Sequence, residues 1–421
     1  MMVKSRKRLL AAMCLLCGFA PLRAEEAVER TGPKHVGRLQ NDKDAWFFQT
    51  TQGKRIPLGQ IAYVRFDAKA TPLPKAPLGW TLLLPNQQRI TGTLLRLDEK
   101  KLVFVTSWGK TIALTREQTI GVEQTALPIV RDDFENGLKA WRIEGKAALS
   151  QERAFFGKSS LLLDTASQSA TREWPPARDV AIRLFFYDPA TPSRLRWTFE
   201  IVPETATEKI PGIVIDQSGY VGANVKQRFA SVQATAGWHL LSVEVESGRL
   251  RLFVDDACLG ETTLPKKAAI KGLRIATTSR IGADKGVGKL WIDELHVVRP
   301  LPALAMPEAI ADQDMAWLEH GEQLFGRAVS ADADVVVLDA KFGKRSLAWS
   351  KLRGILFAKH KLPPMSAEPE ILFRPGPGFP VDCLRAKLLR WEEGKLIVEH
   401  GLLGEIAIER ERLDKIRFAA K

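Results

Sequence analysis

A short pattern of strands and glycines, which recurs along the chain, places the strongest constraint on its fold. It is clearest in the segment Leu82–Val122, LLLPNQQRITGTLLRLDEKKLVFVTSWGKTIALTREQTIGV, where apolar and polar residues alternate as in half-buried strands. Gly92 falls inside a strand and lets that strand bend, whereas Gly109 falls in a tight turn that needs a positive φ. The segment therefore predicts a small, strongly bent sheet.

Three further segments repeat this pattern. In Met315–Phe357, Gly326 and Gly343 keep the spacing of the two glycines of the first segment. Looser copies lie at Val36–Phe66 and Ile371–Phe418, and they close with Val-Arg-Phe and Ile-Arg-Phe. A unit of about 40 residues buries little surface alone. We therefore expect neighbouring copies to pair, one pair before the centre of the chain and one pair after it.

The central region differs from the repeats because its strand-like runs are longer. GWHLLSVEVESGRLRLFVDDACLG is typical, with two apolar runs joined by a Ser-Gly turn. Such spacing predicts a β-sandwich, and proline-rich stretches separate it from its neighbours as extended linkers. The predicted organisation is a signal peptide at 1–24, repeats at 30–67 and 79–125, a sandwich at 130–300, and repeats at 312–359 and 370–419.

The start of the chain has the three parts of a secretory signal peptide. A basic start at Lys4–Arg8 precedes an apolar stretch at Leu9–Ala20 and a small residue at Ala24. We expect cleavage near Ala24 and export to the periplasm, the cell surface or the medium. An uncleaved anchor is the weaker alternative, because the apolar stretch is shorter than the ~20 residues that span a bilayer. No later segment is apolar enough to cross a membrane.

Charge and cysteine content exclude several kinds of site. The net charge of +13 is spread along the chain, and part of it lies in the leader. This spread, together with export, argues against a nucleic-acid partner. Beyond the leader only Cys258 and Cys383 remain, which excludes a four-cysteine metal site. They either form one disulfide or stay as two free thiols.

Two parts of the chain resemble known families. GWHLLSVEVESGRLRLFVDDACLG, with the opening DDFENG and the closing LWIDELHVV, resembles the concanavalin A-like or laminin G-like jelly roll, a fold of lectins, carbohydrate-binding modules and some glycoside hydrolases. ITGTLLRLDEKKLVFVTSWGKTIAL is similar to the Sm-like small barrel. RNA-binding members of that family have an asparagine shortly after an acidic residue, but here Glu99 and Lys100 follow Asp98.

These resemblances imply an all-β, exported bacterial protein. They imply a central jelly-roll β-sandwich flanked by two pairs of small SH3/Sm-like β-barrel repeats, without RNA binding.

The sequence shows no catalytic set. A glycoside hydrolase on a jelly roll needs two carboxylates on one face of a strand. Asp293 and Glu294 are adjacent, and neighbouring residues of a regular strand point to opposite faces. The six histidines include no pair at metal-ligand spacing. We therefore expect that the chain is not an enzyme.

Four residues are candidates for binding. In jelly rolls that this one resembles, acidic residues of the first and last strands meet at a structural calcium ion, and Asp133, Glu135 and Asp293 occupy the matching places. Calcium prefers oxygen ligands; the alternative is that these are ordinary turn carboxylates. Most of the 11 tryptophans are expected in the core. Trp108, in a Ser-Trp-Gly-Lys turn, is the candidate for an exposed ring that stacks on a sugar.

The leading expectation is thus an exported, non-catalytic binding or scaffold protein. Its jelly roll would bind a glycan or a cell-envelope protein, and its repeats would mediate assembly, including self-association. Two alternatives stay open. One is a polysaccharide-acting hydrolase with an unrecognised acid pair, and the other is a nucleic-acid binder that acts through the repeats.

Overall fold

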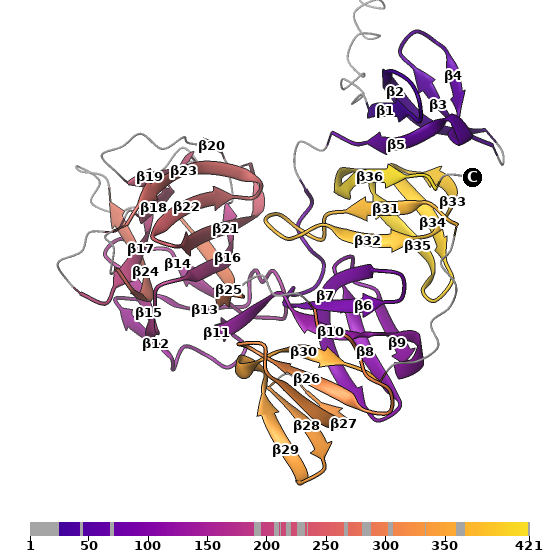
Figure 1. Ribbon diagram of the computed structural model, residues 1–421. Helices are drawn as coiled ribbons and strands as arrows, with labels where there is room; N and C mark the ends of the chain where they lie inside the picture. Colours follow the sequence, from indigo (N-terminus) through magenta and orange to yellow (C-terminus); the bar gives the residue numbers. More distant parts are fainter. Residues whose placement is uncertain are drawn as a thin grey trace, which may run out of the picture.

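The computed structural model describes most of the chain after the predicted signal peptide, which lies outside the described residues (Figure 1). The described ranges are 25–42, 45–67, 71–188, 195–205, 210, 212–215, 220–224, 232–233, 235–264, 268–279, 288–301, 306–332, 334–358 and 367–419. Within them, regular structure is β-strand with four short 3-10 turns, and no helix is long and apolar enough to cross a membrane. The predicted all-β class is confirmed.

Two sheets of the central region pack face to face as a jelly-roll sandwich, which confirms the predicted fold of this region. The first, here called the β25 sheet, has the order β13 (Ala148–Ser150), β14 (Ser160–Leu163), β25 (Leu290–Pro300), β16 (Val180–Asp188), β21 (Gly237–Glu246), β22 (Arg249–Val254) and β23 (Ala257–Thr263), with β11 (Ala126–Asp132) also paired to β25. The second has the order β12 (Trp141–Glu144), β15 (Ser169–Ala177), β24 (Ile270–Ser279), β17 (Leu195–Pro203), β18 (Gly212–Ile215), β19 (Tyr220–Asn224) and β20 (Val232–Gln233).

Side chains along β16 point alternately into the sandwich and away from it. Leu184 and Phe186 are fully buried between the sheets. Arg183, Phe185 and Tyr187 alternate with them and therefore lie on the outer face of the β25 sheet. Arg183 on this face donates a hydrogen bond to the carbonyl of Gly378, so this part of the face meets the last repeat of the chain.

The four repeats share one element order of four strands, a 3-10 turn and a closing strand. In each of the first three repeats the first strand pairs with both the second and the closing strand. Repeat 1 has β1 (Glu25–Glu29), β2 (Lys34–Asp42), β3 (Ala45–Thr50), β4 (Arg55–Pro57), η1 (Leu58–Gln60) and β5 (Ile61–Arg65). Repeat 2 has β6 (Trp80–Leu84), β7 (Gln88–Asp98), β8 (Lys101–Thr106), β9 (Thr111–Thr115), η2 (Arg116–Gln118) and β10 (Gly121–Gln124).

The later repeats follow the same order. Repeat 3 has β26 (Asp314–Leu318), β27 (Gln323–Ala331), β28 (Val335–Ala340), β29 (Gly343–Ala348), η3 (Trp349–Lys351) and β30 (Leu352–Leu356). In repeat 4 the second strand is divided, which gives β31 (Glu370–Phe373), β32 (Asp382–Arg385), β33 (Lys387–Glu392), β34 (Lys395–His400), β35 (Gly404–Glu409), η4 (Arg410–Arg412) and β36 (Leu413–Arg417).

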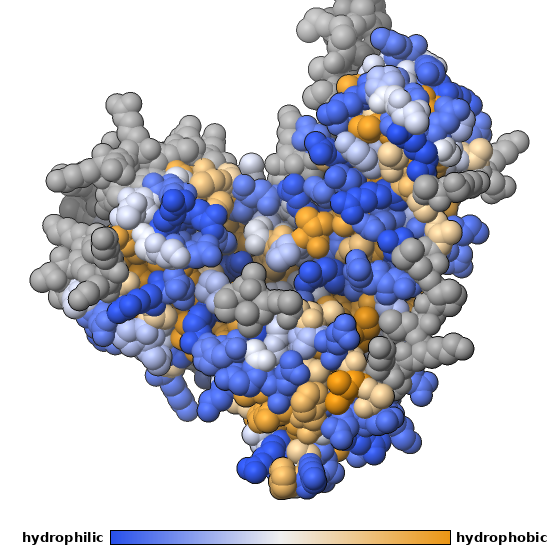
Figure 2. Space-filling view, in the orientation of Figure 1, coloured by the Kyte–Doolittle hydropathy of each residue, from blue (hydrophilic) through white to orange (hydrophobic). Residues whose placement is uncertain are grey.

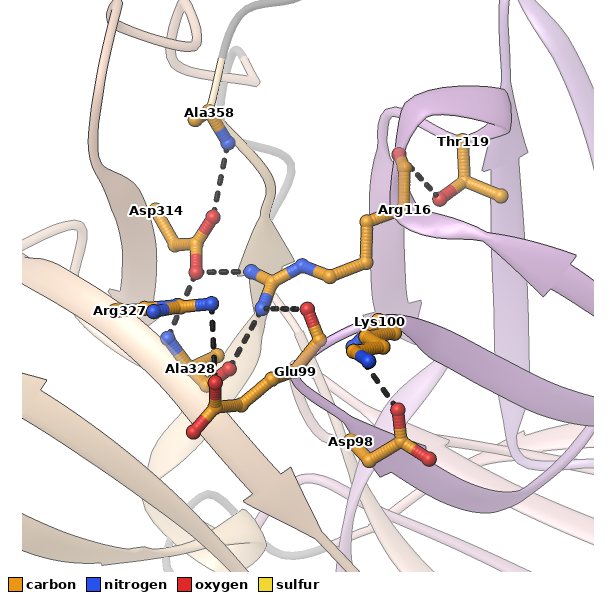
Figure 3. Close-up of polar contacts among 9 residues, drawn as sticks. All are labelled: Asp98, Glu99, Lys100, Arg116, Thr119, Asp314, Arg327, Ala328 and Ala358. Atoms are coloured by element: carbon orange, nitrogen blue, oxygen red, sulfur yellow. Dashed lines mark hydrogen bonds and ion pairs between the residues drawn. The ribbon is translucent and has the colours of Figure 1, made fainter.

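Pairing between repeats does not follow their order in the chain. The closing strands β10 and β30 pair, with Val122 opposite Ile355, so repeat 2 joins repeat 3. The closing strands β5 and β36 pair, with Val64 opposite Ile416, so repeat 1 joins repeat 4. The prediction that copies close in sequence would pair is wrong, because the sandwich is inserted between two nested pairs. Arg116 of repeat 2 also bonds to Asp314 of repeat 3 (Figure 3).

A third contact joins the two pairs into one row, in the order 1, 4, 2, 3 (Figure 1). Cys383 of β32 lies opposite Arg89 of β7 in this contact. Cys383 is half-buried and Cys258 is exposed, and both thiols are free. Of the two states left open for these cysteines, the structure has two free thiols.

The glycines of the repeats have two structural roles, positive φ in turns and close approach between strands. Gly109 and Gly343 have φ of 85° and 98° in their turns, as predicted. Gly92 and Gly326 do not have positive φ; a Cβ at either would collide with a backbone oxygen of the next strand, that of Val105 or that of Asp339. The second strand therefore needs glycine for close approach, just before the register shift where it bends.

Candidate functional site

The outer face of the β25 sheet holds two adjacent carboxylates that a regular strand would separate. β25 places Ile292 and Leu295 in the core, so its apolar alternation slips by one residue at Asp293 and Glu294. The register with β16 shifts at the same point, and Glu294 has a φ of 51°, as in a β-bulge. Both carboxylates therefore lie away from the core. The prediction that they point to opposite faces is wrong.

Asp293 is held by backbone amides. Its Oδ2 accepts hydrogen bonds from the N–H groups of Phe155 at 2.7 Å and Phe156 at 3.2 Å, and its Oδ1 accepts one from Glu294 N–H at 2.8 Å. Burial raises the pKa of Asp293 to about 7, and the amide hydrogen bonds only partly oppose this shift. Near neutral pH this carboxyl can therefore either hold or release a proton.

Glu294 has an imidazole as its partner. Its Oε2 lies 2.8 Å from Nε2 of His296, and the Glu294 side chain is 3% exposed. The site therefore pairs a carboxyl that can be protonated with a carboxylate that accepts a hydrogen bond from a ring nitrogen. Such a combination of environments suits acid and base roles.

A row of aromatic rings continues along the same face. Phe155 stacks on Phe185 with centroids 3.9 Å apart, and Trp238 lies 5.5 Å from Phe155. Tyr187 meets Trp238 and Trp291 edge to face at 5.5 and 5.7 Å. Flat rings side by side on a sheet can support sugar rings.

Cations border this row. The guanidinium of Arg153 lies 4.2 Å from the centre of the Tyr187 ring, and the ammonium of Lys289 lies 5.5 Å from that of Trp291. Both cations belong to exposed residues and lie over the rings, and the Trp291 ring beneath them is 2% exposed. A ligand can therefore reach Trp291 only if these two side chains move.

The carboxylate end of the row is covered by the linker before repeat 2 and by a loop of repeat 4. Arg183 stacks over the ring of Phe379 at 4.4 Å. Pro77 and Phe379 line, with Glu294 and His296, a cavity of about 20 Å³, which holds no more than a water molecule. A ligand can therefore reach the carboxylates only if this cover moves.

The structure separates the predicted calcium ligands. Oδ1 of Asp133 accepts a hydrogen bond from Glu135 N–H at 3.2 Å. Oε1 of Glu135 accepts bonds from Lys158 N–H and Ser159 N–H at 2.6 and 2.7 Å, and these amides lower the pKa of Glu135. Glu135 and Asp293 thus anchor the two ends of one loop. No group of three or more metal-ligating side chains fits a metal ion among the described residues, and calcium binding stays a prediction.

Trp108 lies between repeats 2 and 4. Its ring is half-buried and meets Phe373 edge to face at 5.6 Å. With Lys110 and Arg412 it lines a cavity of about 180 Å³. The ring therefore packs in a junction between repeats, away from the aromatic row of the sandwich. A sugar-binding role for it stays a prediction.

Sequence reasoning missed the carboxylate pair although a signal was present. Leu290 and Ile292 keep one apolar alternation and Leu295 and Val297 keep another, out of phase by one residue. A slip of this kind inside a strand indicates a bulge. The aromatic row was missed for another reason: most tryptophans were expected in the core, and although Trp291 is buried, Trp238 is partly exposed.

Comparison with known proteins finds distant structural likenesses to hydrolases, each over part of this chain. No family model and no curated protein matches the sequence. Among solved structures, a β-glucanase of Bacillus licheniformis is 10% identical over 40% of this chain and 97% of its own, with a TM-score of 0.30. A family 16 glycoside hydrolase from Bacteroides ovatus, in complex with a mixed-linkage glucan product, is 12% identical over 40% of this chain and 99% of its own, with a TM-score of 0.31.

A third match is to a sialidase. It is 11% identical over 47% of this chain, with a TM-score of 0.34, and this chain spans 21% of its length. Likeness at this level shows the fold alone. The neighbours named here are hydrolases and not scaffold proteins, which runs against the expectation of a non-catalytic scaffold that is not an enzyme. The physical argument behind that expectation also fails, because the bulge at Glu294 puts two carboxylates on one face.

Proposed function

We propose that the chain is a polysaccharide-acting hydrolase whose chemistry lies on the outer face of the β25 sheet. The observation that carries the proposal is the bulge in β25, which places Asp293 and Glu294 together on that face. Glycoside hydrolysis needs such a pair, one carboxyl as acid and one as base or nucleophile.

The two carboxyls take different roles because their surroundings differ. Asp293, with its pKa raised to about 7 by burial, donates its proton to the glycosidic oxygen as the bond to the anomeric carbon breaks. Glu294, held by His296, takes a proton from the attacking water, whose oxygen forms the new bond to that carbon. The products are two shorter chains, one with a new reducing end, and solvent returns the proton from Glu294 to Asp293.

The aromatic row supplies the surface on which the substrate lies. Tyr187 and Trp238 are partly exposed beside the carboxylates, and sugar rings stack on faces of this kind. The Phe379 loop covers the carboxylate end, so the substrate enters along the row and displaces this loop. A polysaccharide rather than a small glycoside fits a row of several rings.

The test measures new reducing ends. The chain from residue 25 onward is incubated with soluble mixed-linkage and β-1,3-glucans and with a panel of other polysaccharides. We expect activity that falls as the pH rises through about 7, because Asp293 then loses its proton. Asp293→Asn and Glu294→Gln should each lower kcat by about 10²-fold or more, and Phe379→Ala should raise kcat by exposing the pair.

Glu261→Gln is the matched control, because Glu261 is an exposed carboxylate on β23 of the same sheet, paired with Arg249. It should leave kcat unchanged. Circular dichroism and melting temperatures separate a loss of chemistry from a loss of fold. Binding without cleavage by both the wild type and Phe379→Ala would overturn the hydrolase. Equal losses in Glu261→Gln and Glu294→Gln would overturn the assigned site.

The flanking repeats and the leader complete the proposal. The shared order of four strands, a 3-10 turn and a closing strand supports the inference that each repeat is a small barrel similar to the Sm-like family. The basic and apolar leader supports export to the periplasm, the cell surface or the medium. N-terminal sequencing of protein recovered from cell fractions tests both the cleavage after Ala24 and the compartment.

A further inference from the structure

The contact between repeats 2 and 4 is nearly two-fold symmetric. Arg89 and Cys383 face each other at its centre. On one side the backbone N–H of Thr91 donates to Oδ2 of Asp382 at 2.8 Å, and on the other the backbone N–H of Arg385 donates to Oε1 of Gln88 at 2.6 Å. Each second strand therefore contributes the same two parts, a side-chain acceptor and, three residues later, an amide donor.

The row of repeats alternates between two kinds of contact. Repeats 1 and 4 and repeats 2 and 3 join through their closing strands, and repeats 2 and 3 also pair the far ends of their second strands. Repeats 4 and 2 join instead through the free edge of the first half of each second strand. At both ends of the row the next contact would again use a second strand. These strand edges belong to repeat 1 and repeat 3.

Repeat 3 presents this edge uncovered. The bulge after Gly326 fixes the equivalence with repeat 2: Glu322, Gln323 and Phe325 stand where Gln88, Arg89 and Thr91 stand before Gly92. In the part of the chain that the structure describes, Gln323–Phe325 pairs only with β26, and its other edge carries no strand.

Apolar side chains gather at this edge. Leu324 and Phe325 are each 38% exposed and Phe342 is 82% exposed, although large apolar residues are mostly buried in this chain. They line a groove of about 1300 Å³, and Figure 2 shows apolar residues over repeat 3 at the lower end of the molecule. An uncovered strand edge with exposed apolar residues is typical of a surface that pairs with another chain.

We propose that a second copy of this chain docks here, with the two repeats 3 joined as repeats 2 and 4 are joined. The two β27 strands pair antiparallel, and the two copies of Gln323 face each other on the two-fold axis. The carboxylate of Glu322 accepts a hydrogen bond from the backbone N–H of Phe325 of the second copy, and the reverse. The dimer covers Leu324 and Phe325 on both chains and closes after two copies.

Repeat 1 lacks one of the two parts. Its equivalent residues, before Gly37, are Pro33, Lys34 and Val36. Val36 is exposed by 51%, but proline has no side-chain acceptor. Repeat 1 therefore cannot form both hydrogen bonds of this contact. Both the side-chain acceptor and the amide donor are present when repeat 3 pairs with repeat 3, which gives a closed dimer and no fibre.

Mass measurement tests the dimer. Light scattering on the chain from residue 25 onward should give twice the mass of one chain, and sedimentation equilibrium gives the dimer Kd. Phe325→Lys should raise this Kd by at least about tenfold, because it places a charge in the covered edge, while Glu322→Gln, which keeps an acceptor, should dimerise. Val36→Lys makes the same change at the equivalent exposed position of repeat 1 and should leave the Kd unchanged.

A cross-link tests the register independently of affinity. Residues directly opposite in an antiparallel pair have Cα atoms about 4.5–5.5 Å apart, within the range of about 4.4–6.8 Å that a disulfide spans. In a Cys258→Ser background, Gln323→Cys should oxidise to a covalent dimer, and Lys34→Cys should not. A wild type that is monomeric at every concentration overturns the proposal. So does a cross-link at position 34, or a loss of dimer in Val36→Lys equal to that in Phe325→Lys.

Discussion

Trp80 and Trp349 meet edge to face, with ring centroids 4.2 Å apart, across the junction of repeats 2 and 3. Trp80 begins β6 and Trp349 begins η3. The matching residues on the other side of the junction are Asp314, which begins β26, and Arg116, which begins η2. They form an ion pair (Figure 3). One junction therefore contains an aromatic and an ionic version of the same contact.

Removal of Arg116 should destabilise this junction strongly. Its partner Asp314 is 5% exposed and also accepts hydrogen bonds from the N–H groups of Ala328 and Ala358. Arg116→Ala leaves this carboxylate buried without its cation, which costs about 3–5 kcal/mol. Urea unfolding should show this loss, and the double variant Arg116→Ala/Asp314→Ala should lose less than the sum of the single variants.

The control for this cycle is an exposed ion pair between the same repeats. Arg327 and Glu99 lie 3.0 Å apart with side chains 64% and 50% exposed. Arg327→Ala should cost no more than about 1 kcal/mol. Equal costs for the two arginine variants would contradict the argument from burial.

Gly92→Ala should destabilise the chain although Gly92 has an ordinary φ. The added Cβ collides with the backbone oxygen of Val105 and with the ring of Phe104, and overpacking of this kind costs about 1–3 kcal/mol. Gly59→Ala is the matched control, because no atom lies near its added Cβ, and it should be close to neutral. Thermal or urea unfolding measures both, and a neutral Gly92→Ala would show that β8 can move away.

The sequence predicts those features of the fold that local chemistry decides. The turns at Gly109 and Gly343 could be placed because few residues other than glycine adopt their φ. The sandwich strands could be placed because apolar residues mark their buried faces. The partner of each repeat could not be predicted, because the closing strands are locally alike: Val64, Val122 and Ile355 are all fully buried apolar residues.

The candidate site also depends on contacts that the local sequence does not predict. Asp293 and Glu294 were identified as carboxylates of the last strand, but their common face depends on a bulge. That bulge is stabilised by contacts far away in the sequence, since Asp293 holds the amides of Phe155 and Phe156. The Phe379 loop, which covers the site, comes from a repeat that begins about 70 residues after the sandwich ends, and no local pattern links the two.

Asp382 should make the junction of repeats 2 and 4 less stable as the pH rises. Burial raises the pKa of this carboxyl to about 7 from 3.8. The folded state therefore keeps a proton that the unfolded state loses above about pH 4, and stability falls between about pH 4 and pH 7. Asp382→Asn removes this dependence, and the neutral amide of Gln88 already fills the equivalent place on the other side.

The measurement for Asp382 is urea unfolding of both proteins across this pH range. The free energy of unfolding of the wild type should fall relative to that of Asp382→Asn as the pH rises from 4 to 8. All other titrating groups are common to both proteins and cancel in the difference. A difference that stays constant, or that grows with pH, would contradict a protonated Asp382.

His400, in the same junction, should make the chain less stable as the pH falls, which is the opposite of the effect of Asp382. Its Nδ1 accepts hydrogen bonds from the N–H groups of Leu402 and Leu403, so the ring proton lies on Nε2 and points to Oε1 of Gln88 at 3.0 Å. Burial lowers the pKa of His400 to about 4 from 6.5. The unfolded state takes up a proton first as the pH falls, so stability present above about pH 6.5 is lost between there and pH 4.

His400→Asn keeps an acceptor near the amides of Leu402 and Leu403 and removes the titrating ring. The wild type should therefore lose stability relative to this variant as the pH falls from 7 to 4. Nitrogen NMR of the wild type should show a neutral ring, protonated on Nε2, at pH 5. Titration of His400 near its ordinary pKa of 6.5 would show that water reaches the ring. Because Asp382 and His400 act in opposite directions over nearly the same pH range, their effects on stability should largely cancel between about pH 4 and 6.5. In Asp382→Asn the loss of stability at low pH that His400 causes should therefore become visible.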